Sequence, residues 1–129
     1  MRVLLDTQIF LWMFLNKGKI GAKLWTVLRN GDNELYLSAA SAWEIAIKVR
    51  IGKMKLPNSP VLYVPRRARE SKILSMPISE EHALAVAELP MEHTDPFDRI
   101  LVAQAQLESL TLVTSDPVFK RYDVKCVMA

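Results

Sequence analysis

The chain has 129 residues, half of them apolar, which suits one domain with a hydrophobic core that needs no disulfide. No apolar run approaches the roughly 18 residues of a membrane span, and the first run ends at Asp6, so we expect a cytoplasmic protein without a signal peptide. The net charge of +3, from 17 basic and 14 acidic residues, excludes little by itself.

Short apolar runs alternate with helical patterns along the chain. In chain order the expected elements are strand 3–5, helix 9–14, helix 22–29, strand 35–37, helix 39–51, helix 61–71, strand 73–76, helix 79–87, helix 96–107, strand 110–113, helix 117–122 and strand 124–127. Pro65 weakens the expectation for helix 61–71, because a proline inside a helix removes a hydrogen bond. Strands that alternate with helices predict a single α/β domain over residues 1–129, a three-layer α/β/α sandwich with a central parallel sheet.

Four acidic residues fall near the ends of predicted strands. Asp6 directly follows the first strand, and Asp116 follows the fourth with two residues between. Glu44 lies in the helix after the second strand, and Asp98 lies in the first turn of the helix before the fourth. Ligands of open parallel sheets bind beyond the carboxyl ends of the strands. All four carboxylates could therefore project toward one site at that edge.

Each aspartate also has a structural explanation. Asp6 could cap the following helix, because its side chain can accept hydrogen bonds from free backbone N–H groups. Asp116-Pro117 matches a cap followed by proline at the first helical position. Asp95-Pro96 matches the same pattern and puts Asp98 where a negative charge complements the helix dipole. Considered one at a time, these capping roles are the more common reason for an aspartate.

Glu44 is harder to explain structurally, because apolar residues surround it in a helix that should be largely buried. A buried carboxylate is costly unless it is paired or bound to metal. Two structural alternatives stay open. Glu44 could complete a capping box with Ser41 if the helix begins there, but not if it begins at Ser38. It could also form an ion pair with Lys48, four residues later.

Converging carboxylates would repel one another and raise each other's pKa, and a divalent cation would relieve this repulsion. Magnesium prefers oxygen ligands and is usually held by one or two carboxylates together with substrate phosphate. The cysteine and the two histidines have no zinc-site spacing. Without the four acids the chain has 10 acidic against 17 basic residues, an excess of seven positive charges that suits a polyanionic substrate. These features favour metal-assisted hydrolysis of a phosphate ester.

The sequence resembles the PIN-domain ribonucleases, in particular the toxins of VapC-type toxin–antitoxin pairs. The resemblance lies in residues 3–7, 38–48, 95–105 and 112–116, whose order and spacing match across essentially the whole chain. An aspartate after a first strand is a weak motif. The Trp43-Glu44 pair in its helix and the segment Asp95-Pro96-Phe97-Asp98 are together quite specific.

The resemblance implies strand order 3-2-1-4-5 and an acidic quartet of Asp6, Glu44, Asp98 and Asp116, with Asp6 and Asp98 as the principal ligands of Mg²⁺ or Mn²⁺. It implies an endoribonuclease, the toxin of a VapBC-type system, that forms a homodimer. It also implies a VapB-type antitoxin that occupies the acidic cleft. Asp95 competes with Asp98 for one position in the quartet. The spacing to the family helix favours Asp98, which leaves Asp95 as the cap.

Several basic residues are candidate RNA contacts, because they are expected to flank the strand ends. They are Lys53, Lys55, Arg66, Arg67 and Arg69, and Arg99 is a further candidate because it lies beside Asp98. A solvated basic surface explains them about equally well, and Arg99 could instead pair with an acid. His93 could act as a base, but metal-assisted hydrolysis does not require one.

Two other functions compete with the nuclease. A non-catalytic receiver-like or protein-interaction module also carries aspartates at strand ends, but it leaves Glu44 unexplained. An α/β phosphatase usually has a second aspartate two residues after its nucleophile, whereas Asp6 is followed by Thr7 and Gln8.

Overall fold

The computed structural model describes all residues, 1–129, and contains one five-stranded sheet in the order β3-β2-β1-β4-β5. Every neighbouring pair of strands is parallel. The strands are β1 (Arg2–Leu5), β2 (Glu34–Ser38), β3 (Ile73–Met76), β4 (Thr111–Thr114) and β5 (Cys126–Met128). Both the parallel sheet and the strand order 3-2-1-4-5 are therefore confirmed.

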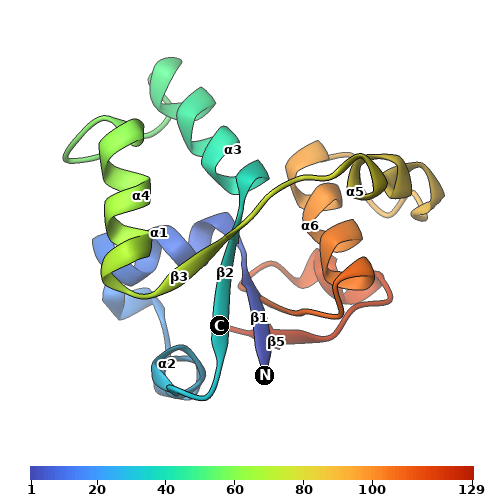
Figure 1. Ribbon diagram of the computed structural model, residues 1–129, viewed down its shortest axis with the longest axis horizontal. Coiled ribbons are helices and arrows are strands. Elements are labelled where there is room, and N and C mark those ends of the chain that lie inside the picture. The colour runs from blue at the N-terminus through green and yellow to red at the C-terminus, as the bar shows by residue number, and fades with distance from the viewer.

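Helices cover both faces of the sheet. Figure 1 shows α1, α2 and α4 on one side of the strands, and α5 and α6 on the other. The α-helices are α1 (Thr7–Leu15), α2 (Ala22–Arg29), α3 (Ala39–Arg50), α4 (Pro60–Glu70), α5 (Glu80–Ala85) and α6 (Pro96–Leu107). Short 3₁₀ segments are η1 (Lys17–Lys19), η2 (Val86–Glu88) and η3 (Pro117–Arg121). The predicted helix 79–87 is wrong beyond Ala85, where the turn tightens to 3₁₀, while α4 continues through Pro65.

The two faces of β1 belong to two separate hydrophobic cores, because side chains alternate along a strand. Val3 and Leu5 pack into the core beneath α1 and its neighbours, and Leu4 packs into the core beneath α6. All three are completely buried. A strand buried on both faces explains why the sequence shows a continuous apolar run here rather than alternation.

The topology gathers several chain segments at one edge of the sheet. Leu5 pairs with Val113, so β1 and β4 end side by side. Helix α3 begins directly after β2, where Ser38 Oγ accepts a hydrogen bond of 3.0 Å from the backbone N–H of Ala40. Helix α6 precedes β4 in the chain and starts above the same edge. The residues that follow β1 and β4 therefore meet the first turns of α3 and α6.

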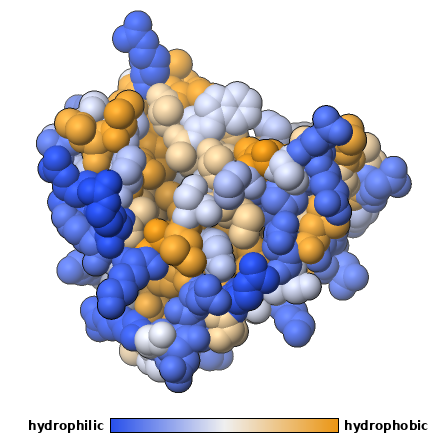
Figure 2. Space-filling model, viewed as in Figure 1, coloured by the Kyte–Doolittle hydropathy of each residue, from blue (hydrophilic) through white to orange (hydrophobic).

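Strand β3 is an open edge with apolar surface beside it. A hollow of about 530 Å³ lies between α4, the start of α3 and β3, and Leu74 on its rim is 47% exposed. Figure 2 shows apolar side chains in the middle of this face with hydrophilic ones around its margin. No helix combines the length and apolar character that a membrane span requires.

Candidate active site

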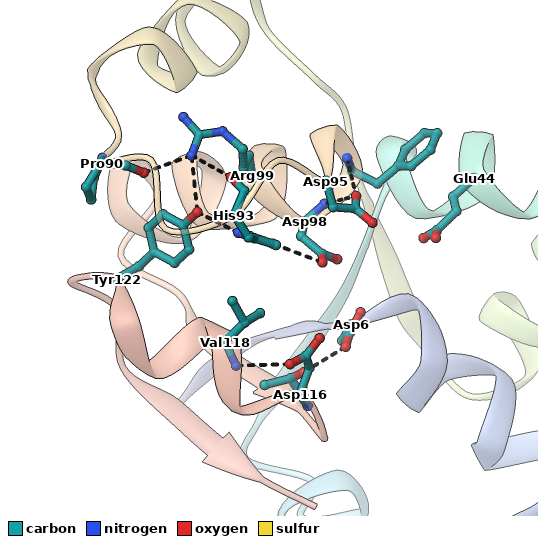
Figure 3. A network of polar contacts seen from close by, with 12 residues as sticks. Asp6, Glu44, Pro90, His93, Asp95, Asp98, Arg99, Asp116, Val118 and Tyr122 are labelled. Carbon is teal, nitrogen blue, oxygen red and sulfur yellow. Dashed lines mark hydrogen bonds and ion pairs between the residues drawn. The ribbon is translucent and has the colours of Figure 1, made fainter.

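All four predicted site acids line one hollow of about 270 Å³ at the carboxyl edge of the sheet. Figure 3 shows their carboxylates facing a common space from α3, from α6 and from the ends of β1 and β4. The charged residues that line the hollow are Asp6, Glu44, Lys48, Asp95, Asp98 and Asp116. Five carboxylates thus share a small volume with one ammonium group.

Asp6 occupies the cap position of α1, but its side chain makes no capping hydrogen bond. Its Oδ2 atom instead accepts a hydrogen bond of 2.7 Å from Thr114 Oγ1, and the residue is only 8% exposed. Thr114 Oγ1 also accepts a hydrogen bond of 3.0 Å from the backbone N–H of Asp116. The side-chain capping explanation for Asp6 is therefore wrong. Thr114 ties the ends of β1 and β4 together, a role that its polar character at the end of a buried strand could have signalled.

Glu44 is 7% exposed and lies inside α3, six residues after the Ser38 cap. Because the helix begins at Ser38, a capping box between Ser41 and Glu44 is excluded. Ser41 Oγ instead accepts a hydrogen bond of 2.8 Å from Thr7 Oγ1. The Lys48 alternative is confirmed as a contact, since Lys48 Nζ lies 2.7 Å from Glu44 Oε2. This pair offsets one negative charge in the hollow and leaves Glu44 Oε1 outside the ion pair.

Asp95 and Asp98 have different roles at the start of α6. Asp95 Oδ1 accepts hydrogen bonds from the backbone N–H groups of Phe97 at 2.8 Å and Asp98 at 3.0 Å, so it is the predicted cap. The Asp98 side chain is not used for capping and points into the hollow (Figure 3). Its Oδ2 lies 3.1 Å from Nε2 of His93.

Asp116 is exposed and lies at the mouth of the hollow. Its Oδ1 accepts a hydrogen bond of 3.0 Å from the backbone N–H of Val118, so the predicted cap of the following turn is present. Capping uses only one of the two carboxylate oxygens. The cap and a place in the acidic cluster are therefore compatible for Asp116.

Crowding and burial make the two most enclosed aspartates hold their protons more strongly. The pKa of Asp98 is raised to about 8, mainly by burial and further by the negative charges of the neighbouring carboxylates Asp95, Asp6, Glu44 and Asp116. Burial is also the main cause of the raised pKa of Asp6, although the hydrogen bond from Thr114 opposes it. The pKa of Lys48 is raised, chiefly by its hydrogen bond to Glu44. The hollow therefore favours positive charge.

The donor set fits a hard divalent cation better than zinc. The structure contains no group of three or more His, Cys, Asp or Glu side chains that could hold a metal ion by themselves. A structural or catalytic zinc site would require such a group. Magnesium is typically held by one or two carboxylates with waters and substrate phosphate. Asp6 is buried and Asp98 is half-buried, and a cation would lower the raised pKa values of both carboxylates. The residues present thus fit Mg²⁺ or Mn²⁺.

The predicted RNA contacts separate into three groups. Lys53 and Lys55 are exposed and flank Met54 in the sequence; Met54 lines the hollow, but neither lysine does. The three arginines of α4, at positions 66, 67 and 69, lie in the last turns of a helix that ends beside the start of β3. In a parallel sheet this is the edge opposite the strand ends that carry the carboxylates, and Figure 1 shows α4 ending beside the start of β3. The expectation that these arginines flank the acidic site is therefore wrong.

The prediction that Arg99 contacts RNA is also wrong. It is 6% exposed, and its guanidinium donates hydrogen bonds to backbone carbonyls and to the Tyr122 hydroxyl. A buried group whose donors are already used cannot hold a substrate phosphate.

Comparisons with known proteins agree with this geometry. The family model of the PIN domain matches residues 3–125. Ribonuclease VapC16 of Mycobacterium tuberculosis is 44% identical over 57 residues, which are 44% of this chain and only 39% of that protein. VapBC2 from Rickettsia felis, solved bound to a DNA fragment from its promoter, superposes with TM-score 0.74 and 20% identity over 99% of this chain and 98% of that chain. FitAcB from Neisseria gonorrhoeae gives TM-score 0.62 and 23% identity over 96% and 95%. The two solved structures show that the fold is shared.

Proposed function

The chain belongs to the PIN domain family, and from this premise we propose that it is a metal-dependent endoribonuclease, the toxin of a VapBC-type toxin–antitoxin pair. The observation that carries the proposal is the convergence of Asp6, Glu44, Asp98 and Asp116 on one hollow at the carboxyl edge of the sheet. The partial match to Ribonuclease VapC16 supports the reaction, and the exposed Lys53 and Lys55, which flank the hollow-lining Met54 in the sequence, support a polyanionic substrate.

In this proposal Asp6 and Asp98 hold Mg²⁺, with Mn²⁺ as a substitute. The bound cation supplies the Lewis acidity that activates water and neutralises charge on the scissile phosphate. Thr114 fixes Asp6 by the hydrogen bond to its Oδ2. Lys48 holds Glu44 Oε2, which leaves Oε1 to accept a hydrogen bond from the attacking water. Lys53 and Lys55 contact RNA phosphates beside the hollow.

Removing divalent cations should stop the reaction. We expect EDTA to abolish cleavage of labelled RNA, and excess Mg²⁺ or Mn²⁺ to restore it. Zn²⁺ should not be required, because the side chains that line the hollow include carboxylates but no cysteine or histidine. Cleavage that continues undiminished in excess chelator would exclude the metal mechanism. Absence of cleavage with every divalent cation would favour the alternative of a non-catalytic interaction module.

We also propose that the chain forms a homodimer and binds a VapB-type antitoxin. An unrestrained ribonuclease would damage its own cell, and the similar solved structures include VapBC2 from Rickettsia felis and a toxin–antitoxin complex from Klebsiella pneumoniae. Apolar side chains are exposed on α4 and β3, among them Val61, Leu62 and Leu74, which is typical of an interaction surface. A basic antitoxin side chain would find complementary charge in the acidic hollow.

Light scattering of the purified chain across micromolar concentrations measures the predicted association directly. We expect the mass of a dimer, and addition of the antitoxin should give a larger complex with no RNA cleavage. A strictly monomeric mass at all concentrations would contradict the homodimer.

A further inference from the structure

Arg99 organises the loop that leads into α6. Its Nη1 donates hydrogen bonds to the carbonyl oxygens of Pro90 at 2.8 Å and His93 at 3.3 Å. Its Nη2 donates to the carbonyls of Val86 at 3.2 Å and Leu89 at 3.4 Å. No carboxylate lies within ion-pair distance of this buried guanidinium. The Arg99 guanidinium therefore fixes the backbone of the loop that carries His93.

Arg99 also determines the direction of a chain of hydrogen bonds. Its Nη1 lies 3.1 Å from the hydroxyl oxygen of Tyr122, which must accept because a guanidinium only donates. The Tyr122 proton is then free to be donated to Nδ1 of His93, 2.6 Å away. With Nδ1 accepting, the neutral imidazole has its proton on Nε2, and that N–H points at Asp98 Oδ2 at 3.1 Å (Figure 3).

We propose that His93 is a positioning residue for Asp98, held in one orientation and one tautomer by Tyr122 and Arg99. This inference rests on the proposed role of Asp98 as a metal ligand. The Nε2–H group of His93 fixes Oδ2 and leaves Oδ1 to bind the cation. Fixing a ligand carboxylate in this way increases metal affinity, because less side-chain freedom is lost on binding.

The packing around His93 supports this role over that of a base. The ring lies edge-on against Phe119 and Tyr122, with centroid distances of 6.3 Å and 5.5 Å. Both of its nitrogens already have protein partners. Such a ring is placed to orient its neighbour and has no free nitrogen to accept a proton from water.

The test is the affinity for Mn²⁺, measured from the free-ion electron paramagnetic resonance signal of the full chain without RNA. We expect His93→Ala to weaken Mn²⁺ binding about 10- to 100-fold, the usual effect of losing a group that orients a ligand. His93→Gln, which keeps an N–H donor, should recover much of this loss. Tyr122→Phe removes only the hydroxyl that sets the tautomer, so we expect a smaller loss of about three- to tenfold.

Tyr63→Phe is the matched control, because Tyr63 is buried on α4 and its hydroxyl has no hydrogen-bond partner. It should bind Mn²⁺ as the wild type does. Melting temperatures in EDTA identify any variant that has lost its fold, and His93→Gln and Tyr122→Phe keep the test decisive if His93→Ala does not fold.

Two outcomes would overturn the inference, and they differ in what they leave standing. Wild-type Mn²⁺ affinity in folded His93→Ala and Tyr122→Phe, together with lost binding in Asp98→Asn, would remove the positioning role and keep the metal site. Wild-type affinity in Asp98→Asn would remove Asp98 as a ligand and with it the basis of the inference.

Discussion

Replacing either proposed metal ligand, as Asp6→Asn or Asp98→Asn, should abolish RNA cleavage and leave the fold intact. Each change keeps the size of the side chain and removes the negative charge that would hold the cation. A bound cation supplies several kcal/mol of transition-state stabilisation, and each 1.36 kcal/mol corresponds to tenfold in rate, so we expect a loss on the order of a thousandfold. Single-turnover cleavage of labelled RNA measures it.

The same substitutions should stabilise the protein in EDTA, which separates a functional role from capping. The pKa of Asp98 is raised from 3.8 to about 8, so the folded state binds the proton more tightly than the unfolded state. Stability is then greatest below the unfolded pKa and falls as the pH rises toward 8. Asparagine has no carboxyl group to ionise, so Asp98→Asn avoids this loss of stability at high pH. The melting temperature of the variant at pH 8 should therefore exceed that of the wild type.

Asp95→Asn is the useful comparison for Asp98→Asn, because asparagine is also a good cap and Asp95 is assigned only to that role. We expect it to remain folded and to keep substantial cleavage activity. Full activity in both Asp6→Asn and Asp98→Asn would refute the site. A collapse in their melting temperatures would instead indicate that these side chains stabilise the fold.

Glu44→Gln should abolish cleavage nearly as completely as Asp6→Asn or Asp98→Asn. Glutamine preserves the size and hydrogen-bonding capacity of the side chain, but a neutral amide cannot polarise the attacking water. General-base groups contribute about 10² to 10⁴ in rate, so we expect a loss of on the order of a hundredfold or more. If Glu44 served only its ion pair with Lys48, the cost would be about 0.3 to 0.5 kcal/mol of stability and activity would survive.

Glu70→Gln provides the matched control for Glu44→Gln. Glu70 also forms an ion pair on a helix, 2.8 Å from Arg67, but it lies on α4 beside the opposite edge of the sheet. The same chemical change there should leave cleavage unaffected. Near-normal single-turnover cleavage by Glu44→Gln at saturating enzyme would remove Glu44 from the site.

Most of the fold could be predicted from the sequence, because each apolar run or helical period has a clear end. Helix 22–29, strand 73–76 and helix 96–107 have the predicted bounds, since Gly, Pro or polar residues punctuate them. A continuous apolar run also identifies β1, a central strand that is buried on both faces of the parallel sheet. Helix 79–87 was less predictable, because its apolar periodicity continues through a 3₁₀ turn.

The convergence of the acids could also be predicted, but their hydrogen-bond partners could not. The sequence allowed both Asp6 and Asp116 to be helix caps. Only the structure shows that Asp116 caps the following turn, whereas the side chain of Asp6 accepts a hydrogen bond from Thr114. The partners Thr114 and Tyr122 come from segments distant from the aspartates in sequence. Their contacts depend on the register of β1 against β4 and on the path of η3, which local patterns do not determine.

The basic residues were the least predictable part of the site. Arg99 directly follows Asp98, but neighbouring residues on a helix are rotated by about 100°, so its side chain points into the protein. The arginines of α4 are close in sequence to β3 but lie at the edge where that strand begins. Charge alone does not show at which end of a sheet a residue lies.

A Mg²⁺ titration of single-turnover RNA cleavage, with wild type and Asp98→Asn side by side, tests the metal-dependent carboxylate site most directly. We expect no cleavage by the wild type in EDTA, a rate that rises and saturates with Mg²⁺, and background rates for Asp98→Asn at every concentration. A wild-type rate that is independent of Mg²⁺, or an Asp98→Asn rate that reaches the wild-type plateau, would contradict the assignment of this hollow as the site of RNA hydrolysis.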